Sequence, residues 1–286
     1  MTDSLTVAVI GSRSYVGSHL CGALESAGHD VVALTRETFD VTDHDAALPK
    51  PVDVAIFLAQ DRNYTSLNTP ALGVFDVNTV GVLNAAIKAR DAGARGFLFT
   101  STGNVYAPSF EAHSEDEELA RSDIYSTSKV FAEQILDLAA GDLTICRPRL
   151  FGAYGPNQEI GLMAGLANRI RSAQPVTAQP RIAGVADGGF TASLTHVDDI
   201  AAGLVELAEL SVGGGVPYAV NLAASEPTTI TDLAHRIGVA LGVDVDIQTA
   251  DGVRPFDLIA DTSRMSSLLS TSFRSTATGI ADALQA

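Results

Sequence analysis

Apolar residues along the chain follow two alternating patterns, short continuous runs and longer stretches with helical spacing. The runs at 5–10, 31–34, 52–58, 96–101 and 143–147 have the length and composition of buried strands. Between them, apolar positions recur every three or four residues and predict helices at 16–27, 78–92 and 123–139. Strand and helix therefore alternate, which predicts an α/β fold built on a doubly wound parallel sheet.

The first strand opens into a turn that contains two glycines. Gly11 and Gly17 flank Ser14, and the helix that follows from Val16 stops at Gly28. Backbone N–H groups at such a helix start face the phosphates of a dinucleotide. The usual fingerprint has a third glycine where Ser14 stands, and a βα turn that binds no nucleotide is the alternative. The turn residues that we expect to bind a cofactor are Gly11, Arg13, Ser14, Tyr15, Val16 and Gly17.

The ends of the later strands add further cofactor positions, because ligands of doubly wound sheets bind at the carboxyl ends of strands. The second strand ends in Thr35 and Arg36, where an NAD enzyme would carry an acidic residue. Arg36 and Arg13 together would suit the 2′-phosphate of NADP, whereas two solvated arginines would leave NAD equally acceptable. We predict NADP, with NAD as the alternative. The other expected cofactor residues are Thr35, Arg36, Asp40 near the adenine, Leu58, Ala59, Gln60 and Thr100.

Tyr125 and Lys129 lie four residues apart on the predicted helix 123–139, so both side chains project from one face. An ammonium beside a phenol favours the phenolate and lowers the pKa of the phenol from about 10 towards working pH. A general acid or base needs this property. The pair predicts redox chemistry at a C–OH or C=O carbon, with both residues also touching the cofactor.

Composition narrows the class of protein. A chain of 286 residues with 46% apolar content can bury a large core. The formal charge of −16 argues against nucleic acid or an anionic membrane as a partner. The sequence shows no apolar run of membrane-spanning length and no basic start of a signal peptide, so we expect a cytoplasmic protein. The two cysteines and six histidines have no metal-ligand spacing, and no metal site is expected.

Several blocks of sequence resemble one known family. With the glycine turn, they are 52–59, 78–84, 97–106, 149–156 and 195–201. The chain resembles, from about residue 7 to 284, the extended short-chain dehydrogenases/reductases of the NAD-dependent epimerase/dehydratase family, which modify nucleotide sugars. The resemblance implies a Rossmann-type sheet in residues 1–154 and a smaller α/β substrate lobe in 155–286, from which about 196–225 returns to the first domain. It also implies a homodimer formed through helices 78–92 and 123–139.

The resemblance assigns roles to the catalytic residues. Thr102 would hydrogen-bond the reacting oxygen and Tyr125 would exchange the proton. Lys129 would tune Tyr125 and hold the nicotinamide ribose. The substrate residues that we expect are Asn104, Arg149, Gly152 and Arg254.

The reaction within the family depends on a few positions. Dehydratases carry an Asp-Glu pair after the strand-end threonine, whereas this chain has Gly103 and Asn104, so dehydration is disfavoured. Two reactions remain: a ketoreductase that uses NADPH once and releases NADP, and an epimerase that keeps NAD and returns the hydride. Arg13 and Arg36 favour reduction of a keto group on a nucleotide-linked or related sugar. A protein that binds the dinucleotide without turnover is a third hypothesis.

Two departures from the family concern the sugar nucleotide. Gly152 replaces a usual asparagine, and Ala192 replaces a usual arginine that holds the diphosphate. Because a diphosphate needs charged partners, either Arg254 or Arg181 serves instead or the substrate is not a standard nucleotide sugar. We expect the acidic run 115–118 to be a solvated loop without a catalytic role.

Overall fold

The computed structural model describes residues 4–49, 51–61, 71–139 and 141–284. The chain forms two compact units. The first unit comprises 1–107, 118–149 and 201–220, and the second comprises 108–117, 150–200 and 221–286. Within the described residues, no helix combines the length and the apolar character that a bilayer crossing requires.

A seven-stranded sheet runs through the first unit as far as the described residues show it, in the order β11-β6-β4-β3-β1-β2, with β5 paired to β6. β1 pairs in parallel with β2 and β3, and β4 pairs in parallel with β3 and β6. The sequence order therefore reverses between β1 and β3, where such sheets bind ligands. The strands are β1 (Thr6–Ile10), β2 (Asp30–Leu34), β3 (Val54–Phe57), β4 (Gly96–Phe99), β5 (Ser101–Thr102), β6 (Thr144–Leu150) and β11 (Ala219–Leu222).

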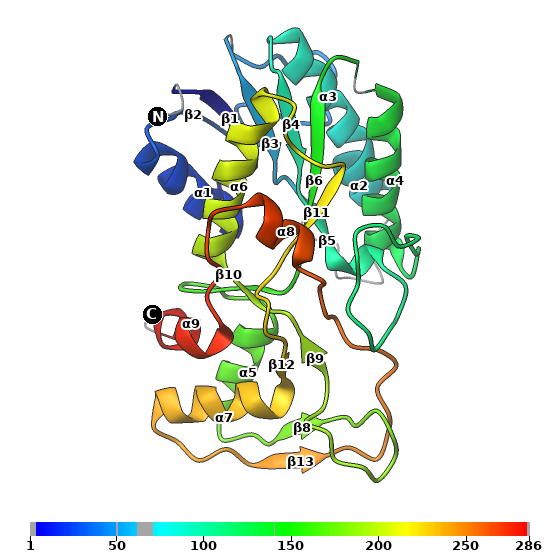
Figure 1. Ribbon diagram of the computed structural model, residues 1–286, viewed down its shortest axis with the longest axis vertical. Helices are drawn as coiled ribbons and strands as arrows, with labels where there is room; N and C mark the ends of the chain where they lie inside the picture. Colours follow the sequence, from blue (N-terminus) through cyan, green and yellow to red (C-terminus); the bar gives the residue numbers. More distant parts are fainter. Residues whose placement is uncertain (1–3, 50, 62–70, 140, 285–286) are drawn as a thin grey trace. The chain divides into compact units, whose positions relative to one another are not determined.

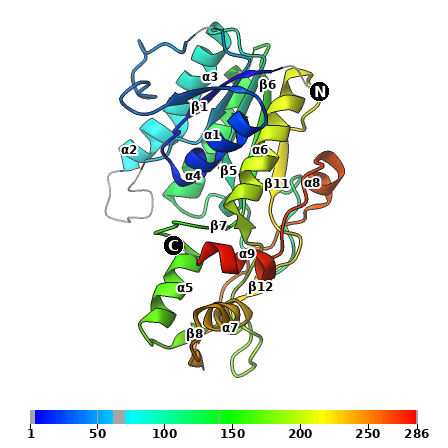
Figure 2. The same ribbon diagram turned by 90° about the vertical axis from the view of Figure 1, so that its left-hand side faces the viewer.

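Helices cover both faces of this sheet (Figures 1 and 2). α1 (Tyr15–Ser26) and α6 (Val197–Val212) lie along one face, and α3 (Gly81–Asp91) and α4 (Ile124–Ala139) lie along the other. The α/β fold class expected from the sequence is confirmed. The predicted helix 78–92 is not uniformly α-helical. Its first residues belong to a π-helical turn, η1 (Asp76–Val80), which follows α2 (Ala71–Phe75) and leads into α3.

The core of the first unit explains the continuous apolar runs. Every residue of β3 and β4 is buried, since helices cover both faces of these strands. Phe57 of β3 and Phe99 of β4 pack with ring centroids 6.1 Å apart. α4 contributes Ala132 and Leu136 to the same cluster, and this packing fixes α4 against the sheet.

The second unit has its own core. α5 (Leu162–Arg171) and α7 (Ile230–Leu241) lie side by side and bury Leu166, Leu233 and Ile237 together (Figure 2). The remaining elements are β7 (Ala153–Tyr154), β8 (Val176–Ala178), β9 (Thr191–Ala192), β10 (Thr195–His196), β12 (Thr228–Thr229), β13 (Ile247–Thr249), α8 (Ser263–Leu268) and α9 (Thr276–Ala283). Their strands form three two-stranded ladders among the described residues, β7–β10, β9–β12 and β8–β13.

The acidic run 115–118 lies partly in the second unit and is not simply solvated. Glu115 is buried, and its Oε1 accepts a hydrogen bond from the backbone N–H of Asn221 at 2.9 Å. Glu117 accepts hydrogen bonds from the backbone N–H of Ser114 and lies 2.8 Å from Nδ1 of His113. The expectation of a solvated loop was therefore wrong for Glu115, whose bond to Asn221 holds 108–117 in the second unit, whereas Glu117 is exposed.

Two glycines with nearly the same backbone conformation allow a matched test of the β1–α1 turn. Gly11 has φ +91°, and a Cβ there would lie 2.6 Å from the backbone nitrogen of Ala59; Gly93 has φ +90° and open space. We expect Gly93→Ala to cost about 1 kcal/mol of unfolding free energy from the left-handed backbone alone. Gly11→Ala should cost at least about 2 kcal/mol more, because the added methyl meets backbone. Urea unfolding measures both, and equal losses would contradict the close packing of the turn.

Candidate active site

The glycine turn after β1 is built by backbone contacts that only glycine permits. The N–H groups of Gly11 and Ser12 both donate to the carbonyl of Leu34, at 2.9 and 3.0 Å, which ties the turn to the end of β2. A Cβ on Gly17 would overlap the carbonyl oxygen of Gly11. Ser14, which stands in the place of a third glycine, caps α1: its Oγ accepts from the N–H of Gly17 at 3.1 Å. Ser14 therefore stabilises the start of α1.

Nε2 of Gln60, which follows β3, and Oγ of Ser101 in β5 are buried and have no hydrogen-bond partner among the described residues. Buried polar groups are almost always paired in folded proteins, so unpaired ones at the carboxyl edge of a sheet fit a polar ligand. Leu58 and Ala59 line the same strand end, and the backbone of Ala59 lies against Gly11.

The two arginines expected near a 2′-phosphate are each held by a carboxylate. Arg13 Nη1 lies 3.4 Å from Oε2 of Glu37, and Arg36 Nε lies 3.2 Å from Oδ2 of Asp40. Hydrogen bonds from the N–H and hydroxyl of Thr42 lower the pKa of Asp40, and Arg36 lowers it further. Both arginines are largely exposed, and exposed ion pairs are worth at most about 1 kcal/mol. Glu37, which the sequence analysis missed, is the acidic residue nearest the end of β2.

Tyr125 and Lys129 lie on the inner side of the first turns of α4. Tyr125 is half-buried and Lys129 is 3% exposed. Nζ of Lys129 donates to the carbonyl of Thr100 at 3.0 Å and lies 4.8 Å from the ring centroid of Phe99. This hydrogen bond joins the helix that carries the phenol to the end of β4, two residues before Thr102.

Thr102 ends strand β5 and caps the turn that follows it. It is buried and caps the short 3₁₀ helix η2 (Gly103–Val105), because its Oγ1 accepts from the N–H of Asn104 at 3.2 Å. Asn104 itself is exposed. Ser126 and Asp123 form a reciprocal cap at the start of α4, at 2.7 and 3.0 Å, which fixes where Tyr125 enters the helix.

Burial changes the charge state of Lys129. Desolvation of the ammonium lowers the pKa of Lys129 to about 8, and the negative charge of Glu133 opposes this effect. The side chain is therefore protonated below about pH 8 and loses its proton as the pH rises through that value. The ammonium of Lys129 stands one helical turn from the half-buried phenol of Tyr125, and its positive charge can stabilise the phenolate form of that residue.

The expected substrate residue Arg149 lies inside the first unit. It is 1% exposed, and its Nε and Nη2 donate to the two carboxylate oxygens of Glu133 at 3.1 and 2.7 Å. Its Nη1 donates to the hydroxyl of Tyr106 at 2.8 Å. All three nitrogens of the guanidinium thus have protein partners.

The expected substrate residues of the second unit differ in their burial and in their contacts with other residues. Arg254 is buried between Asp187 and Asp257, with nitrogen–oxygen distances of 2.8 and 2.7 Å. Gly152 has φ +44°, and a Cβ there would lie 2.5 Å from Cδ2 of Leu194. Ala192 is buried in β9. Arg181 is exposed, and its guanidinium lies 4.2 Å from the ring centroid of Phe110.

One group in the second unit has the composition of a metal site, His196 with Asp198 and Asp282. The Nδ1 of His196 accepts from the N–H of Asp198 at 3.3 Å, and Nε2 lies 3.1 Å from Oδ2 of Asp282, without hydrogen-bond geometry. The two ring nitrogens thus face different partners. Arg274 binds Asp199 at 2.8 Å and lies 3.9 Å from Asp282, so a guanidinium already offsets these carboxylates. We assign no metal to this group.

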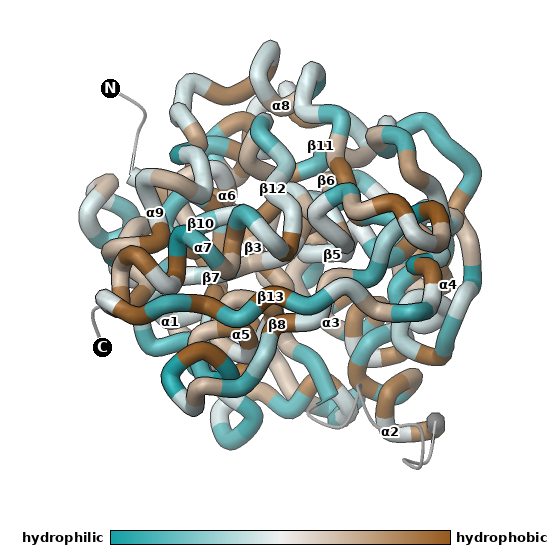
Figure 3. The backbone as a smooth tube through the Cα atoms, turned by 90° about the horizontal axis from the view of Figure 1, so that it is seen from below, coloured by the Kyte–Doolittle hydropathy of each residue, from teal (hydrophilic) through white to brown (hydrophobic). Residues whose placement is uncertain are grey.

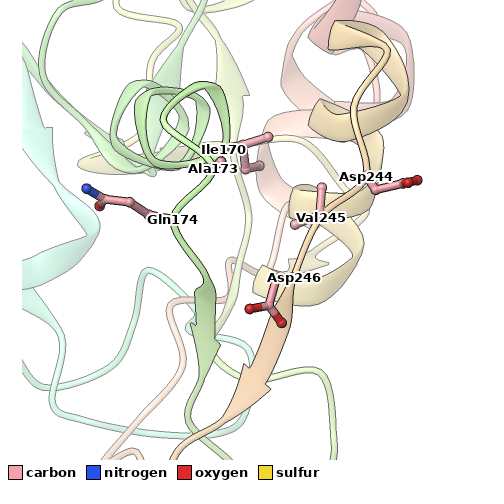
Figure 4. A pocket seen from close by; sticks show the side chains of 6 residues that line it. All are labelled: Ile170, Ala173, Gln174, Asp244, Val245 and Asp246. Carbon is pink, nitrogen blue, oxygen red and sulfur yellow. The ribbon is translucent and has the colours of Figure 1, made fainter.

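A hollow of about 350 Å³ lies between the end of α5 and the start of β13 (Figure 4). Its sides are Ile170, Ala173 and Val245, while the polar ends of Gln174 and Asp246 point in different directions. A ligand site needs polar groups that converge, so this hollow is not a candidate active site.

The fold and the glycine turn define the class of dinucleotide-binding α/β proteins. Residues 7–223 match the model of the NAD dependent epimerase/dehydratase family, and the chain belongs to that family. The resemblance found in the sequence is therefore confirmed.

Relatives within the family have different activities. The spore coat polysaccharide biosynthesis protein SpsK of Bacillus subtilis (strain 168) is 26% identical over 210 residues, which cover 70% of this chain and 69% of that protein. The dTDP-4-dehydrorhamnose reductase of Mycobacterium tuberculosis is 27% identical over 221 residues, covering 74% and 69%. The UDP-glucuronic acid decarboxylase 1 of Arabidopsis thaliana is 27% identical over 259 residues, covering 82% and 58%.

Solved structures share the fold along nearly the whole chain. MoeE5 in complex with UDP-glucose and NAD has a TM-score of 0.79 at 20% identity and covers 97% of both chains. RMD from Pseudomonas aeruginosa complexed with NADPH has a TM-score of 0.80 at 19% identity and covers 98% of this chain and 96% of its own. Reductases, epimerases and decarboxylases thus all occur among similar proteins.

Proposed function

We propose that the protein is an NADP-dependent ketoreductase that acts on a keto group of a nucleotide-linked or related sugar. A reduced nicotinamide bound at this site would supply a hydride to the carbonyl carbon, and Tyr125 gives its proton to the carbonyl oxygen, which becomes a hydroxyl. Thr102 hydrogen-bonds that oxygen. Lys129 stabilises the phenolate that Tyr125 becomes and binds the nicotinamide ribose.

The observation that carries this proposal is the placement of Lys129. Its ammonium is buried, bonds the carbonyl of Thr100 and stands one helical turn from the half-buried Tyr125. Burying a cation is costly, and a protein that needed only structure would gain more from an apolar residue there. A general acid needs such a counter-charge nearby when it loses its proton.

The residues of the glycine turn fit a nicotinamide dinucleotide. Gly11 and Gly17 bring the backbone close at the start of α1, and Gln60 and Ser101 offer unpaired polar atoms. Bound there, the cofactor would supply the hydride. We assign Arg13 and Arg36 to the 2′-phosphate, because their exposed pairs with Glu37 and Asp40 exchange at low cost for charge-assisted bonds to a phosphate. RMD from Pseudomonas aeruginosa, complexed with NADPH, supports this choice.

The substrate side of the proposal rests on charges in the second unit. Arg254 is already held by two carboxylates, so we assign any anionic group of the substrate to Arg181, which is exposed and stacks on Phe110. With Ala192 in β9 in place of a cation, a related sugar without a diphosphate suits these groups at least as well as a nucleotide sugar.

An epimerase with internally recycled NAD is the second candidate function. Glu37 lies close to the end of β2 and would accept hydrogen bonds from an adenosine ribose, as acidic residues do in NAD enzymes. MoeE5, in complex with UDP-glucose and NAD, supports this alternative. The two candidates differ in what copurifies: an epimerase retains NAD, whereas a reductase exchanges NADPH freely. A titration of cofactor-stripped protein with NADPH and NADH separates them.

We also propose a homodimer through the outer face of α4. Ile124, Phe131 and Leu138 recur seven residues apart on this helix, and Leu138 is 88% exposed. Leu72 in α2 and Val80 in η1 are further exposed apolar residues. Figure 3 shows brown, hydrophobic segments in the backbone trace of α2 and α4. The same apolar face on two copies of the chain can pack against itself about a two-fold axis.

Tyr125→Phe tests the catalytic role. We expect the variant to bind NADPH as the wild type does and to lose at least about 10²-fold in kcat, because the general acid is gone. Steady-state reduction of keto-sugars and NADPH fluorescence measure the two properties. Tyr218→Phe is the control, since its half-exposed phenol bonds Asp137 and not the site, and it should retain kcat. Near-normal turnover by Tyr125→Phe would refute the mechanism.

Arg36→Ala tests the cofactor preference. Losing a charged partner of the 2′-phosphate should raise the Kd of NADPH by about tenfold or more and change that of NADH by less than about twofold. Arg90→Ala removes another partly exposed arginine, paired with Asp91, and should change neither constant. Equal effects of Arg36→Ala on both cofactors would remove the argument for NADP.

Leu138→Asp tests the dimer. A carboxylate on the exposed stripe of α4 should convert a dimer into monomers in sedimentation velocity, because it would be buried without a partner. Val239→Asp changes an equally exposed apolar residue on α7 and should leave the dimer intact. A wild-type monomer, or an unchanged dimer in Leu138→Asp, would contradict the assigned surface.

A further inference from the structure

A fully buried ion pair joins α4 to β6, one helical turn beyond Lys129. Glu133 of α4 and Arg149 of β6 are 0% and 1% exposed, and two nitrogens of the guanidinium bond the two oxygens of the carboxylate. Burial alone would lower the pKa of Arg149, but the hydrogen bonds and the charge of Glu133 raise it, so the guanidinium stays charged. The guanidinium of Arg149 is therefore positively charged at working pH, and it binds both carboxylate oxygens of Glu133.

The position of Glu133 relates it to the site. Tyr125, Lys129 and Glu133 follow one another at four-residue steps and so share one face of α4. Burial lowers the pKa of Lys129 to about 8, and the negative charge of Glu133 opposes this shift. The phenol, the ammonium and the carboxylate therefore form a row along one face of α4, in which the charge of one group affects its neighbours.

The remaining groups around this row come from other elements. Arg149 approaches from β6, and its third nitrogen bonds the hydroxyl of Tyr106, which follows η2. The end of β4 contributes only the carbonyl of Thr100 and the ring of Phe99. η1 contributes the uncharged Asn78 and Thr79, which bond Ser128. Among these groups, Glu133 is the one carboxylate: it binds the buried Arg149 and stands four residues from the buried Lys129 on the same helix.

A purely structural reason for the pair is weak. Two charges removed from water cost several kcal/mol each, and well-packed apolar residues of similar volume often stabilise a protein as much or more. A buried carboxylate next to a buried ammonium, in contrast, offsets the cost of keeping that ammonium charged in a dry site. The pair therefore has a use that an apolar replacement cannot supply.

We infer that Glu133, clamped by Arg149, is a positioning residue that supplies the internal counter-charge through which Lys129 remains an ammonium beside Tyr125. The inference rests on the role proposed above for Lys129. Through Arg149 and Tyr106, the same clamp links the helix of Tyr125 with the turn that follows Thr102. No bond forms or breaks in this role; Glu133 acts only through its charge and its fixed place.

The test observes Lys129 directly. The chain has three lysines, Lys50, Lys88 and Lys129, so a protein labelled with ¹³C,¹⁵N-lysine gives few side-chain signals, and Lys129→Met identifies the one of interest. We expect the wild-type signal to titrate at about pH 8. In Glu133→Gln the titration should move to lower pH, because the charge that raises the pKa of Lys129 is absent.

A second variant guards against misfolding, since Glu133→Gln leaves Arg149 buried without its anion. Glu133→Leu/Arg149→Met removes both charges and keeps an apolar pair of similar size. If this variant folds, its Lys129 signal should also titrate at lower pH. Its kcat should fall at least about fivefold at pH 9 and stay within about twofold of wild type at pH 6, where Lys129 is protonated in both.

The matched control is Asp137→Asn, one turn further along α4. Asp137 also pairs with an arginine of β6, Arg147, but through one oxygen only and with a partly exposed side chain, and it does not contribute to the pKa shift of Lys129. Asp137→Asn should leave both the titration and the pH profile unchanged. An unchanged Lys129 titration in the folded double variant would overturn the inference. A shifted titration in a protein that reduces no keto-sugar would uphold the role of Glu133 and refute the proposed function instead.

Discussion

The cost of burying charge is the constraint on which the proposed catalytic side of the first unit depends. Lys129, Glu133 and Arg149 are all removed from water between α4 and the sheet. Isolated, each would be prohibitively unstable, so each is bonded: Lys129 to a carbonyl, and Glu133 to the guanidinium of Arg149. These bonds fix the rotation and height of α4, which in turn fixes where the phenol of Tyr125 lies.

The cofactor side depends on steric constraints instead. Gly11 and Gly17 let the turn after β1 pack against the backbone at the end of β3 and against itself, at distances that a side chain would forbid. Ser14 shows that the turn tolerates a side chain where it can cap the helix. The two parts of the proposed site thus have different requirements. The residues at α4 need partners that compensate their buried charges, whereas the turn after β1 needs glycines because a side chain would not fit.

Much of the fold could be predicted from the sequence, because apolar periodicity reports burial directly. The strands at 6–10, 30–34 and 96–99 and the helix at 124–139 lie within one or two residues of their predicted bounds, and the family assignment is confirmed. Helix 78–92 was predicted as one uniform element, and the π-helical turn at its start was not predicted, since its hydrogen-bond pattern leaves no mark on the spacing of apolar residues.

The sequence by itself determined the alternation of strand and helix, the glycine turn and the i, i+4 spacing of Tyr125 and Lys129, because these are local properties of the chain. Only the tertiary structure decided which charges meet. Arg149 and Arg254 look alike as candidate substrate cations in the sequence, yet Arg149 is bonded to Glu133, sixteen residues away, and Arg254 is bonded both to Asp257, three residues away, and to Asp187, sixty-seven residues away. Electrostatic pairing depends on distance in space, and chain separation does not encode it.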